Sequence, residues 1–480
     1  MPIAALTQLI TTDVILYDVT RLINRRLAPF ATGIDRVDIS FALGLAESAP
    51  ERVVFVAKRG GDGAIVERDL AVDFMRAMQE AWLDGEARDR SFSRRLERAG
   101  VVDNMLGPLA FDLDRLAAMP VAERSAHFAG LLAAGDPRHV LPAAFGRLHT
   151  VHPGLSRAAT LALALAPRLA NGAVRLLRKA ETRLAAARDK GLAARLKERL
   201  DGRTATYFVC SHHGFAQRPG FLKGLRDAAR FDVLAYIHDI IPIQYPEYIR
   251  PKQIGRFARY LEEIVAAGGR FVCNSADTAA RLTAHGEAMG WQAPVVAVIR
   301  PKTEVPPLAD RPPSPAVREI LAGALPYFVT VGTIEPRKNH LLLLHLWREL
   351  ADAGLAVVPH LHIVGKRGWE NENVVDLLER SPAIGRHVTE HGALDDGSLF
   401  HLLKGASALL FPSFAEGLGL PLIEAAALGV PVIASDLPVF RELGLDGVTL
   451  IDPLDAAAWK RECLAATARK AAPDEGPSGL

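Results

Sequence analysis

The residues whose types and spacing best suit chemistry lie in the segment FPSFAEGLGLPLIE, residues 411–424. The segment opens on an apolar run typical of a buried strand and closes on a helical pattern. Gly417 and Gly419 between them free the backbone to present unpaired N–H groups at a helix N-terminus, which favours an anion. Two carboxylates, Glu416 in the loop and Glu424 about one turn into the helix, only accept hydrogen bonds, which suits sugar hydroxyls. Such a glutamate pair also arises by chance, so its position between strand, glycine loop and helix is what marks it as a candidate site.

A second candidate segment is VGTIEPRKNH, residues 331–340. Arg337 and Lys338 stand between the end of a strand-like run and a leucine-rich helix that we expect to begin around Asn339. Two fixed cations beside a helix N-terminus suit a diphosphate, because neither alone neutralises its charge. The alternative is a solvated basic turn that follows Pro336.

The elements that must position these residues are short, continuous apolar runs, each followed by a helical pattern. The first series comprises VILYDV (14–19), RVVFVA (52–57), TYFVC (206–210), DVLAYIHD (232–239), RFVCNS (270–275) and VVAVIR (295–300). The second comprises PYFVTVGT (326–333), HLHIVG (360–365), HVTEHG (387–392), ALLFPS (408–413), PVIAS (431–435) and VTLIDP (448–453). Continuous runs indicate strands buried on both faces, hence parallel sheets covered by helices. Two series predict an α/β protein with two doubly wound, Rossmann-like domains.

The boundary between the two series lies near 301–325, where proline and polar residues concentrate as in a linker. We therefore expect a first domain over 1–305, a second over 306–455, and a C-terminal helix and tail over 456–480. Residues 60–205 lack convincing strand patterns and predict a helical insertion in the first domain. Because ligands bind beyond the carboxyl ends of parallel strands, two facing sheets would place their functional loops across one cleft.

Composition narrows the class of protein. Of 480 residues, 49% are hydrophobic and 23% charged, which excludes extended disorder and fibrous architectures. The net charge of +2 argues against a nucleic-acid binder. The stretch 147–203, however, carries 13 Lys and Arg against four acidic residues. Its part 171–200 is helical in composition, and it predicts either peripheral contact with an anionic membrane or a solvated helical insertion.

Cysteine usage and the N-terminal sequence bear on the compartment. Cys210, Cys273 and Cys463 are too few and too scattered for a disulfide scaffold, and the first two close apolar runs as buried thiols do. The start, MPIAALTQLITTDV, has no basic region typical of a signal peptide, and the longest uncharged apolar stretch, 158–166, is too short to span a bilayer. We expect a cytoplasmic protein, with contact at the inner face of the membrane left open.

Taken together, these motifs resemble those of the family 4 (group 1) retaining glycosyltransferases, which have the GT-B fold. The resemblance rests on VGTIEPRKNH, on IVGKRGW (363–369), on the segment 411–442 and on IDP (451–453), in the order and spacing of that family. The first half matches more thinly, through TGIDRV (32–37), IHDIIPIQYPEY (237–248) and CNSADT (273–278). The resemblance implies two facing Rossmann-like domains, with a C-terminal helix that packs back toward the first.

The resemblance also implies roles for the loop and helix of the first candidate segment. Glu416 resembles the family glutamate that contacts the donor sugar, and Glu424 resembles the one that holds the ribose hydroxyls of the nucleotide. The backbone beside the sugar and diphosphate would be that of Gly417, Leu418, Gly419 and Leu420.

Further roles follow by position outside that segment. Lys338, and with it Arg337, resemble the cations on the pyrophosphate. His238 resembles the family histidine near the transferred sugar, and Gly33 resembles the glycine loop that lets phosphate and acceptor approach the backbone. Thr333 is a departure, since many members carry an additional arginine there.

The function that the resemblance implies is transfer of a sugar from a nucleoside diphosphate to an acceptor hydroxyl, with retention, in surface polysaccharide or lipopolysaccharide biosynthesis. The acceptor would be a glycan or a lipid-linked glycan. No HExxH, paired CxxC or DxD-like motif stands at a strand end, so we expect neither a metal nor another cofactor. Two alternatives remain: a non-catalytic transferase-like subunit that binds a sugar nucleotide, and a nucleotide-dependent oxidoreductase. The second lacks its main signal, a GxGxxG motif after the first strand.

Overall fold

The computed structural model describes residues 2–26, 28, 30–59, 62–84, 95–96, 191–212, 220–303, 305, 307–309, 311–392 and 394–471. The chain forms two compact units. The first comprises Met1–Val53, Ala71–Asp89 and Arg203–Leu480, and the second comprises Val54–Leu70 and Arg90–Gly202. Most of the expected helical insertion, residues 97–190, lies outside the described residues. This range includes most of the basic stretch 147–203.

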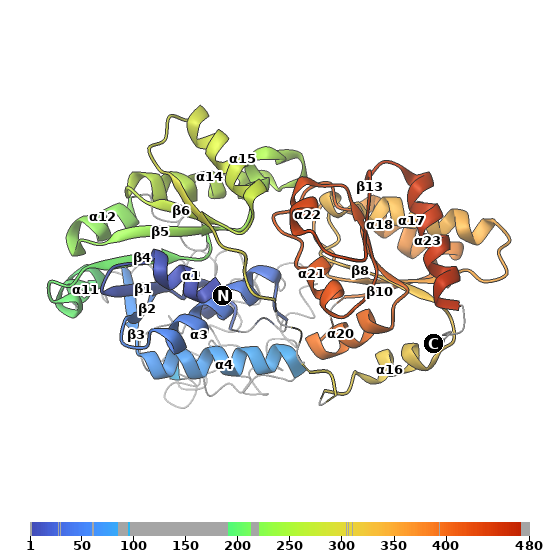
Figure 1. The fold of residues 1–480 in the computed structure, drawn as a ribbon, viewed down its shortest axis with the longest axis horizontal. Helices are drawn as coiled ribbons and strands as arrows, with labels where there is room; N and C mark the ends of the chain where they lie inside the picture. Colours follow the sequence, from blue (N-terminus) through green and yellow to red (C-terminus); the bar gives the residue numbers. More distant parts are fainter. Residues whose placement is uncertain are drawn as a thin grey trace, which may run out of the picture. The chain divides into compact units, whose positions relative to one another are not determined.

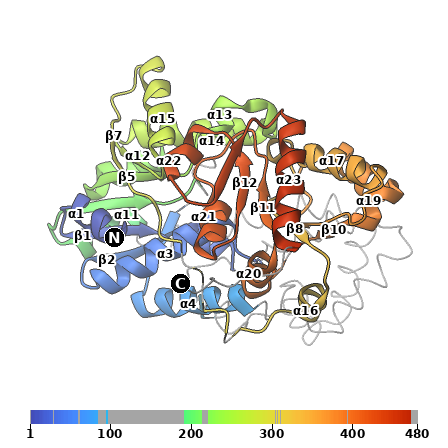
Figure 2. The same ribbon diagram turned by 45° about the vertical axis from the view of Figure 1, so that its right-hand side comes forward.

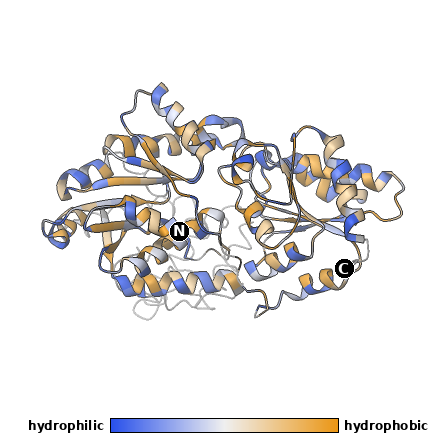
Figure 3. Ribbon diagram, in the orientation of Figure 1, coloured by the Kyte–Doolittle hydropathy of each residue, from blue (hydrophilic) through white to orange (hydrophobic). Residues whose placement is uncertain are grey.

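The N-terminal part of the first unit is built on parallel strands in the order β1-β4-β5-β6-β7. These strands are β1 (Val14–Asp18), β4 (Ala205–Val209), β5 (Asp232–Ile237), β6 (Arg270–Cys273) and β7 (Val295–Val298). The helices of this part are α1 (Pro2–Leu9), α2 (Thr20–Asn24), α3 (Gly33–Ser48), α4 (Arg68–Asp84), α12 (Phe221–Ala229), α13 (Ile241–Gln244), α14 (Pro251–Ala266), α15 (Ala276–Ala288) and the 3₁₀ turn η1 (Pro246–Tyr248). In α4, apolar residues three or four positions apart are buried, so the helix is amphipathic (Figure 3).

The C-terminal part of the first unit has a six-stranded parallel sheet of its own, in the order β10-β9-β8-β11-β12-β13 (Figure 1). The strands are β8 (Tyr327–Val331), β9 (His360–Val364), β10 (Val388–His391), β11 (Ala408–Phe411), β12 (Val432–Ser435) and β13 (Val448–Ile451). The helices are α16 (Pro315–Ala322), α17 (His340–Asp352), α18 (Glu372–Arg380), α19 (Pro382–His387), α20 (Asp396–Gly405), α21 (Leu420–Ala427), α22 (Pro438–Leu443), α23 (Ala456–Ala471) and the 3₁₀ turn η2 (Pro336–Lys338). Counted along the chain, the strand order is 3-2-1-4-5-6, that of a dinucleotide-binding fold.

Both faces of this sheet are buried, as the continuous apolar runs predict. Along β11, Leu409 and Phe411 pack in one hydrophobic cluster with residues of α20, α21 and α22. Ala408 and Leu410 pack in the opposite cluster with residues of α17, α18 and α23. Side chains alternate between the faces of a strand, so a strand covered on both sides must be apolar at every position. In Figure 3 the strands are accordingly mostly orange.

The second unit contains a β-hairpin and a helix among its described residues. Strands β2 (Val53–Arg59) and β3 (Asp62–Val66) pair antiparallel, and α11 spans Leu192–Leu200. A Cβ atom at Gly63 would overlap the side chain of Leu192, so α11 lies close to β3. Leu192, Leu196 and Leu200 are buried. The leucine face of this helix therefore packs inside the protein. Residues 171–190 lie outside the described residues, so peripheral contact with a membrane stays a prediction.

Each of the twelve expected strands is present, and Cys210, Cys273 and Cys463 are buried free thiols. The prediction that 60–205 holds no strand was wrong, because β3 lies there; its apolar part is only Ala64–Val66, too short to register as a run.

The packing expected for the C-terminal helix was also wrong. Trp459 and Cys463 of α23 are buried against the second sheet, over which the helix lies in Figure 2. The sheets divide within the expected linker, while the domain boundaries at 305 and 455 stay predictions. Among the described residues, no helix is long and apolar enough to cross a membrane.

Candidate functional site

The two candidate segments meet because their strands are neighbours. Strands β8 and β11 are neighbours in the sheet. The strand that follows β8 in the chain, β9, lies on one side of this pair, and the strand that follows β11, β12, lies on the other. This is the topological switch point of the sheet, where open α/β sheets bind their ligands. Residues 332–338 follow β8 and residues 412–419 follow β11. The topology thus brings Lys338 and Glu416 to the same edge of the sheet.

Glu416 is the centre of a partly buried charge cluster. Its Oε1 atom lies 2.5 Å from the Lys338 ammonium and 2.9 Å from the Arg337 guanidinium. The Lys338 ammonium also lies 4.4 Å from the centre of the Phe411 ring, a cation–π distance. Burial opposes ionisation of Glu416, but the two cations outweigh it and hold the pKa at about 2. Burial lowers the pKa of Lys338, an effect that Glu416 counteracts.

Arg337 is held by the protein itself rather than directed at an open space. Its Nε and Nη2 atoms donate to Oε1 of buried Glu335 at 3.1 and 2.6 Å, and its Nη1 donates to the Ala415 carbonyl at 2.6 Å. Its own carbonyl accepts from Phe414 N at 2.8 Å. These contacts tie the loop after β8 to the loop after β11. The role of Arg337 on a diphosphate stays a prediction, whereas its role in fixing the Glu416 loop is visible.

The glycine loop 417–419 lies close to other parts of the backbone. A Cβ atom at Gly417 would overlap the carbonyl oxygen of His238. The Gly417 carbonyl accepts hydrogen bonds from the hydroxyls of Ser275, at 2.9 Å, and Thr278, at 3.3 Å. Gly419 has a φ of +87° and is the N-cap of α21, a backbone conformation that favours glycine. Loop and helix begin where the residue pattern predicted them.

Glu424 lies in α21 and is engaged by a residue from the other half of the unit. Its Oε1 accepts from Arg36 Nη1 at 2.7 Å, and Arg36 Nη2 donates to Asp396 at 2.5 Å. Burial, reinforced by Glu424 and opposed by Arg36, raises the pKa of Asp396 to about 6. Glu416 lines one pocket, beside α13 and α15, and Glu424 lines another, beside Arg36 and Asp396. That one ligand engages both stays a prediction.

Gly33 is the first residue of α3. Thr32 caps this helix, its hydroxyl accepting from Asp35 N and its N–H donating to the Asp35 carboxylate. A Cβ atom at Gly33 would lie 3.0 Å from the Leu420 side chain, at the start of α21. The glycine loop and the glutamate loop are therefore near each other, as the expected roles require.

His238 follows the end of β5 and is partly buried. Its Nε2 lies 2.8 Å from the Cys210 carbonyl and so carries the proton that it donates there. Burial lowers its pKa to about 4. Asp239 accepts from Ile241 N at 3.0 Å, so it caps the following turn.

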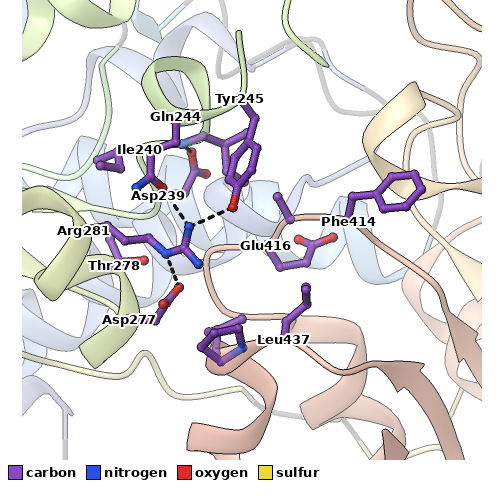
Figure 4. A pocket seen from close by; sticks show the side chains of 14 residues that line it. Asp239, Ile240, Gln244, Tyr245, Asp277, Thr278, Arg281, Phe414, Glu416 and Leu437 are labelled. Atoms are coloured by element: carbon purple, nitrogen blue, oxygen red, sulfur yellow. Dashed lines mark hydrogen bonds and ion pairs between the residues drawn. The ribbon is translucent and has the colours of Figure 1, made fainter. Parts of the chain in front are cut away.

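A polar pocket adjoins Glu416 (Figure 4). One side comes from α13, α15 and the turn before α13, with Asp239, Gln244, Tyr245, Asp277 and Arg281. The other side comes from residues 414–416 and 437–439. Figure 4 shows Arg281 reaching toward Tyr245 and Asp277 across the pocket wall.

Several residues of the site escape sequence reasoning. Arg36, Asp396 and Glu335 bind the predicted residues, yet they are ordinary charged residues in the sequence. Glu335 lies two positions before Arg337 and Arg36 lies within TGIDRV, so both are close to quoted segments, whereas Asp396 offers no local signal. In the described part of the chain, no group of three or more His, Cys, Asp or Glu residues is arranged to hold a metal ion.

Comparison with known proteins shows which families the C-terminal part resembles. Residues 318–469 match the family model for glycosyl transferases group 1. Over 276 residues the chain is 30% identical to the serotype-specific mannosyltransferase WbdA of Escherichia coli, covering 54% of this chain and 33% of that protein. Over 132 residues it is 36% identical to the O-antigen chain mannosyltransferase B of E. coli, covering 28% and 34%. The chain thus spans about a third of the length of these relatives.

Solved structures give weaker likenesses. The sucrose-phosphate synthase of Thermosynechococcus elongatus superposes with a TM-score of 0.42 and 21% identity, over 58% of this chain and 69% of that one. The trehalose 6-phosphate synthase of Burkholderia multivorans gives 0.44 and 14%, over 58% and 67%. Both TM-scores lie below 0.5, so these likenesses do not support the fold class. It rests on the sequence match and on the two parallel sheets, which agree with the expected GT-B class. Residues 318–469, which carry Lys338, Glu416 and Glu424, are thus similar to the group 1 glycosyltransferases.

Proposed function

We propose that this chain transfers a sugar from a nucleoside diphosphate to an acceptor hydroxyl, with retained configuration, in the assembly of a surface polysaccharide or lipopolysaccharide. One observation carries the proposal: an ionised glutamate, Glu416, held by a partly buried lysine, Lys338, at the switch point of a dinucleotide-binding sheet. The two relatives described above are mannosyltransferases by name, which makes a mannosyl donor the first to test.

In the proposed reaction the donor separates Lys338 from Glu416. The Lys338 ammonium moves to the diphosphate, and the Glu416 carboxylate accepts from hydroxyls of the donor sugar. Arg337 stays with Glu335 and keeps the loop in place. Lys338 and the N-terminus of α21 stabilise the charge that develops on the diphosphate.

The bond changes then balance without a further reactant. The C1–O bond of the donor breaks and the diphosphate leaves with the electron pair. The acceptor oxygen bonds to C1 from the same face, and its proton passes to the departing phosphate. We propose that this step needs no metal, because the site supplies its own cation.

We also propose a cytoplasmic location, since three free, buried cysteines suit a reducing compartment. Contact with an anionic membrane would have to use a surface other than the leucine face of α11.

The test is release of nucleoside diphosphate from a panel of sugar nucleotides that includes GDP-mannose, with and without EDTA. We expect release with one donor, unchanged by EDTA, and a loss of about 10²–10³-fold in kcat for Lys338→Ala and Glu416→Gln. Lys460→Ala is the matched control, because Lys460 lies 2.5 Å from Glu349 in an exposed pair. Full activity of either site variant would overturn the assignment. Donor binding without release would instead indicate a non-catalytic subunit.

A further inference from the structure

We propose that the polar pocket beside Glu416 is the subsite for the terminal sugar of a neutral glycan acceptor. This inference rests on the proposed function and names the second substrate of the same site. It is carried by the position of the pocket, by its hydrogen-bonding groups, by its charge and by the aromatic rings that adjoin it.

Position is the first argument. Glu416 lines the pocket, and so do its neighbours Phe414 and Ala415. The opposite wall comes from α13 and α15, which follow the strands β5 and β6 of the other sheet. A sugar bound there has the proposed donor carboxylate on one side. Transfer requires this proximity, since acceptor oxygen and donor carbon must come within about 3–3.5 Å of each other.

The hydrogen-bonding groups of the pocket are already arranged. Arg281 Nε lies 2.8 Å from the Asp277 carboxylate, and its Nη1 lies 3.1 Å from Gln244 Oε1 and 3.0 Å from the Tyr245 hydroxyl. Figure 4 shows this network along one wall. It offers a carboxylate, an amide, a phenol and a guanidinium, which together donate to and accept from hydroxyl groups. Few, fixed polar groups of this kind orient a ligand in a pocket.

Charge decides between a neutral and an anionic ligand. Three acidic residues, Asp239, Asp277 and Glu416, line the pocket, and Arg281 is the basic residue among its lining residues. Lys338 and Arg337 lie against Glu416, Arg337 also pairs with Glu335, and Arg281 pairs with Asp277, so each of these cations already has a carboxylate partner. A phosphate would have to take one of these cations from its carboxylate, whereas a sugar with only hydroxyl groups needs no free cation. The pocket therefore suits a neutral glycan and not the diphosphate of the donor.

Aromatic rings extend from the pocket. The Tyr245 and Tyr248 rings lie 6.1 Å apart at an interplanar angle of 27°, and the Tyr248 and Phe414 rings lie 5.9 Å apart at 8°. All three side chains are partly exposed. Their stacking makes a rigid apolar ridge beside the polar wall, against which the C–H groups of a sugar ring can pack. A ridge of this length also offers contact to a second sugar of the acceptor.

The experiment compares Arg281→Ala with Arg380→Ala. Both arginines pair with an aspartate four residues earlier on a helix, but the Arg380–Asp376 pair on α18 is mostly exposed. With the donor that is active in the release assay and an α-linked mannotriose as acceptor, we expect Arg281→Ala to raise the acceptor KM about tenfold. The donor KM and the acceptor-independent release should stay within twofold of the wild type. Gln244→Ala, an exposed position, should raise the acceptor KM about threefold without affecting folding.

Binding without turnover keeps this proposal separate from the proposed function. Saturation-transfer NMR of mannotriose and of a panel of neutral oligosaccharides should show binding to the wild type and to Arg380→Ala. The affinity of Arg281→Ala should be about tenfold lower. Pyrophosphate should not displace the bound oligosaccharide. If oligosaccharide binding depends on Arg281 but the protein releases no nucleoside diphosphate, the pocket is a sugar site and the transferase proposal is wrong. The inference is overturned if no neutral oligosaccharide binds, if binding is equal in all variants, if pyrophosphate displaces the sugar, or if Arg281→Ala changes only the donor KM.

Discussion

At the scale of single residues, the two neighbouring cations of the RK pair have different environments. Arg337 presents a planar fork that is filled by Glu335 and the Ala415 carbonyl, while Lys338 offers one compact charge to Glu416. The sequence placed both residues beside the helix but did not distinguish their roles. Adjacent side chains in a turn point in different directions, and the sequence does not show which direction each takes. Their different contacts explain why we assign the diphosphate to Lys338 and the fixing of the loop to Arg337.

His238 gives a test of pH dependence at this scale. Its folded pKa, about 4, is below the ordinary value of 6.5, so its contribution to stability is complete above pH 6.5 and is lost as pH falls toward 4. The free energy of unfolding of the wild type, relative to His238→Gln, should therefore decrease by up to about 3 kcal/mol over this interval. Denaturation midpoints of the two proteins between pH 4 and 7.5 measure it. Parallel curves would show that this imidazole titrates normally. Other buried histidines are common to both proteins and cancel.

At the scale of elements, the loop between β11 and α21 depends on one close approach. Gly417 lies against the His238 carbonyl, and its own carbonyl is held by the hydroxyls of Ser275 and Thr278. The sequence marked this glycine as freeing the backbone for a ligand. The structure adds that the residue also has no room for a side chain.

Gly417→Ala should therefore move the loop. The added methyl group would overlap a backbone oxygen that cannot rotate away, which costs about 1–3 kcal/mol and displaces Glu416. We expect a lower melting temperature and at least a tenfold loss of sugar transfer. Gly385→Ala on α19 is the control, because nothing lies within 4 Å of its added Cβ atom and alanine favours a helix. If Gly417→Ala is as stable and active as this control, the close approach is not needed.

At the scale of the whole molecule, contacts between the first and second sheet regions fix the site within the first unit. The Glu442 carboxylate, on α22, accepts from Ala276 N at 2.9 Å and from Asp277 N at 3.1 Å, at the first turn of α15. A carboxylate at a helix N-terminus is favoured both by hydrogen bonds and by the helix dipole. Because α15 also carries Arg281 and Thr278, this contact positions the pocket wall and the Gly417 loop together.

Glu442→Ala should lower the free energy of unfolding by about 1–2 kcal/mol, the usual loss on removing a helix cap. It should also raise the acceptor KM, because α15 loses its anchor. Thermal melting and acceptor titration measure the two effects. Glu349→Ala, which removes a mostly exposed partner of Lys460, should cost less than about 1 kcal/mol and leave the KM unchanged. Equal effects of the two substitutions would contradict the role of Glu442.

The sequence alone determined the class of fold, since twelve continuous apolar runs require strands covered on both faces, and each is present. It also placed Glu416, Glu424 and Lys338 correctly on their loops and helix, because strand ends, glycines and helix starts are local signals. Only the tertiary structure decided which charges meet. Arg36 and Glu424 are 388 positions apart, and Ser275 and Gly417 are 142 apart, so no local pattern relates them. Which residues meet across the fold depends on the positions of whole helices and strands. Those positions depend on all the contacts of the core, and not on the residues that are neighbours in the sequence.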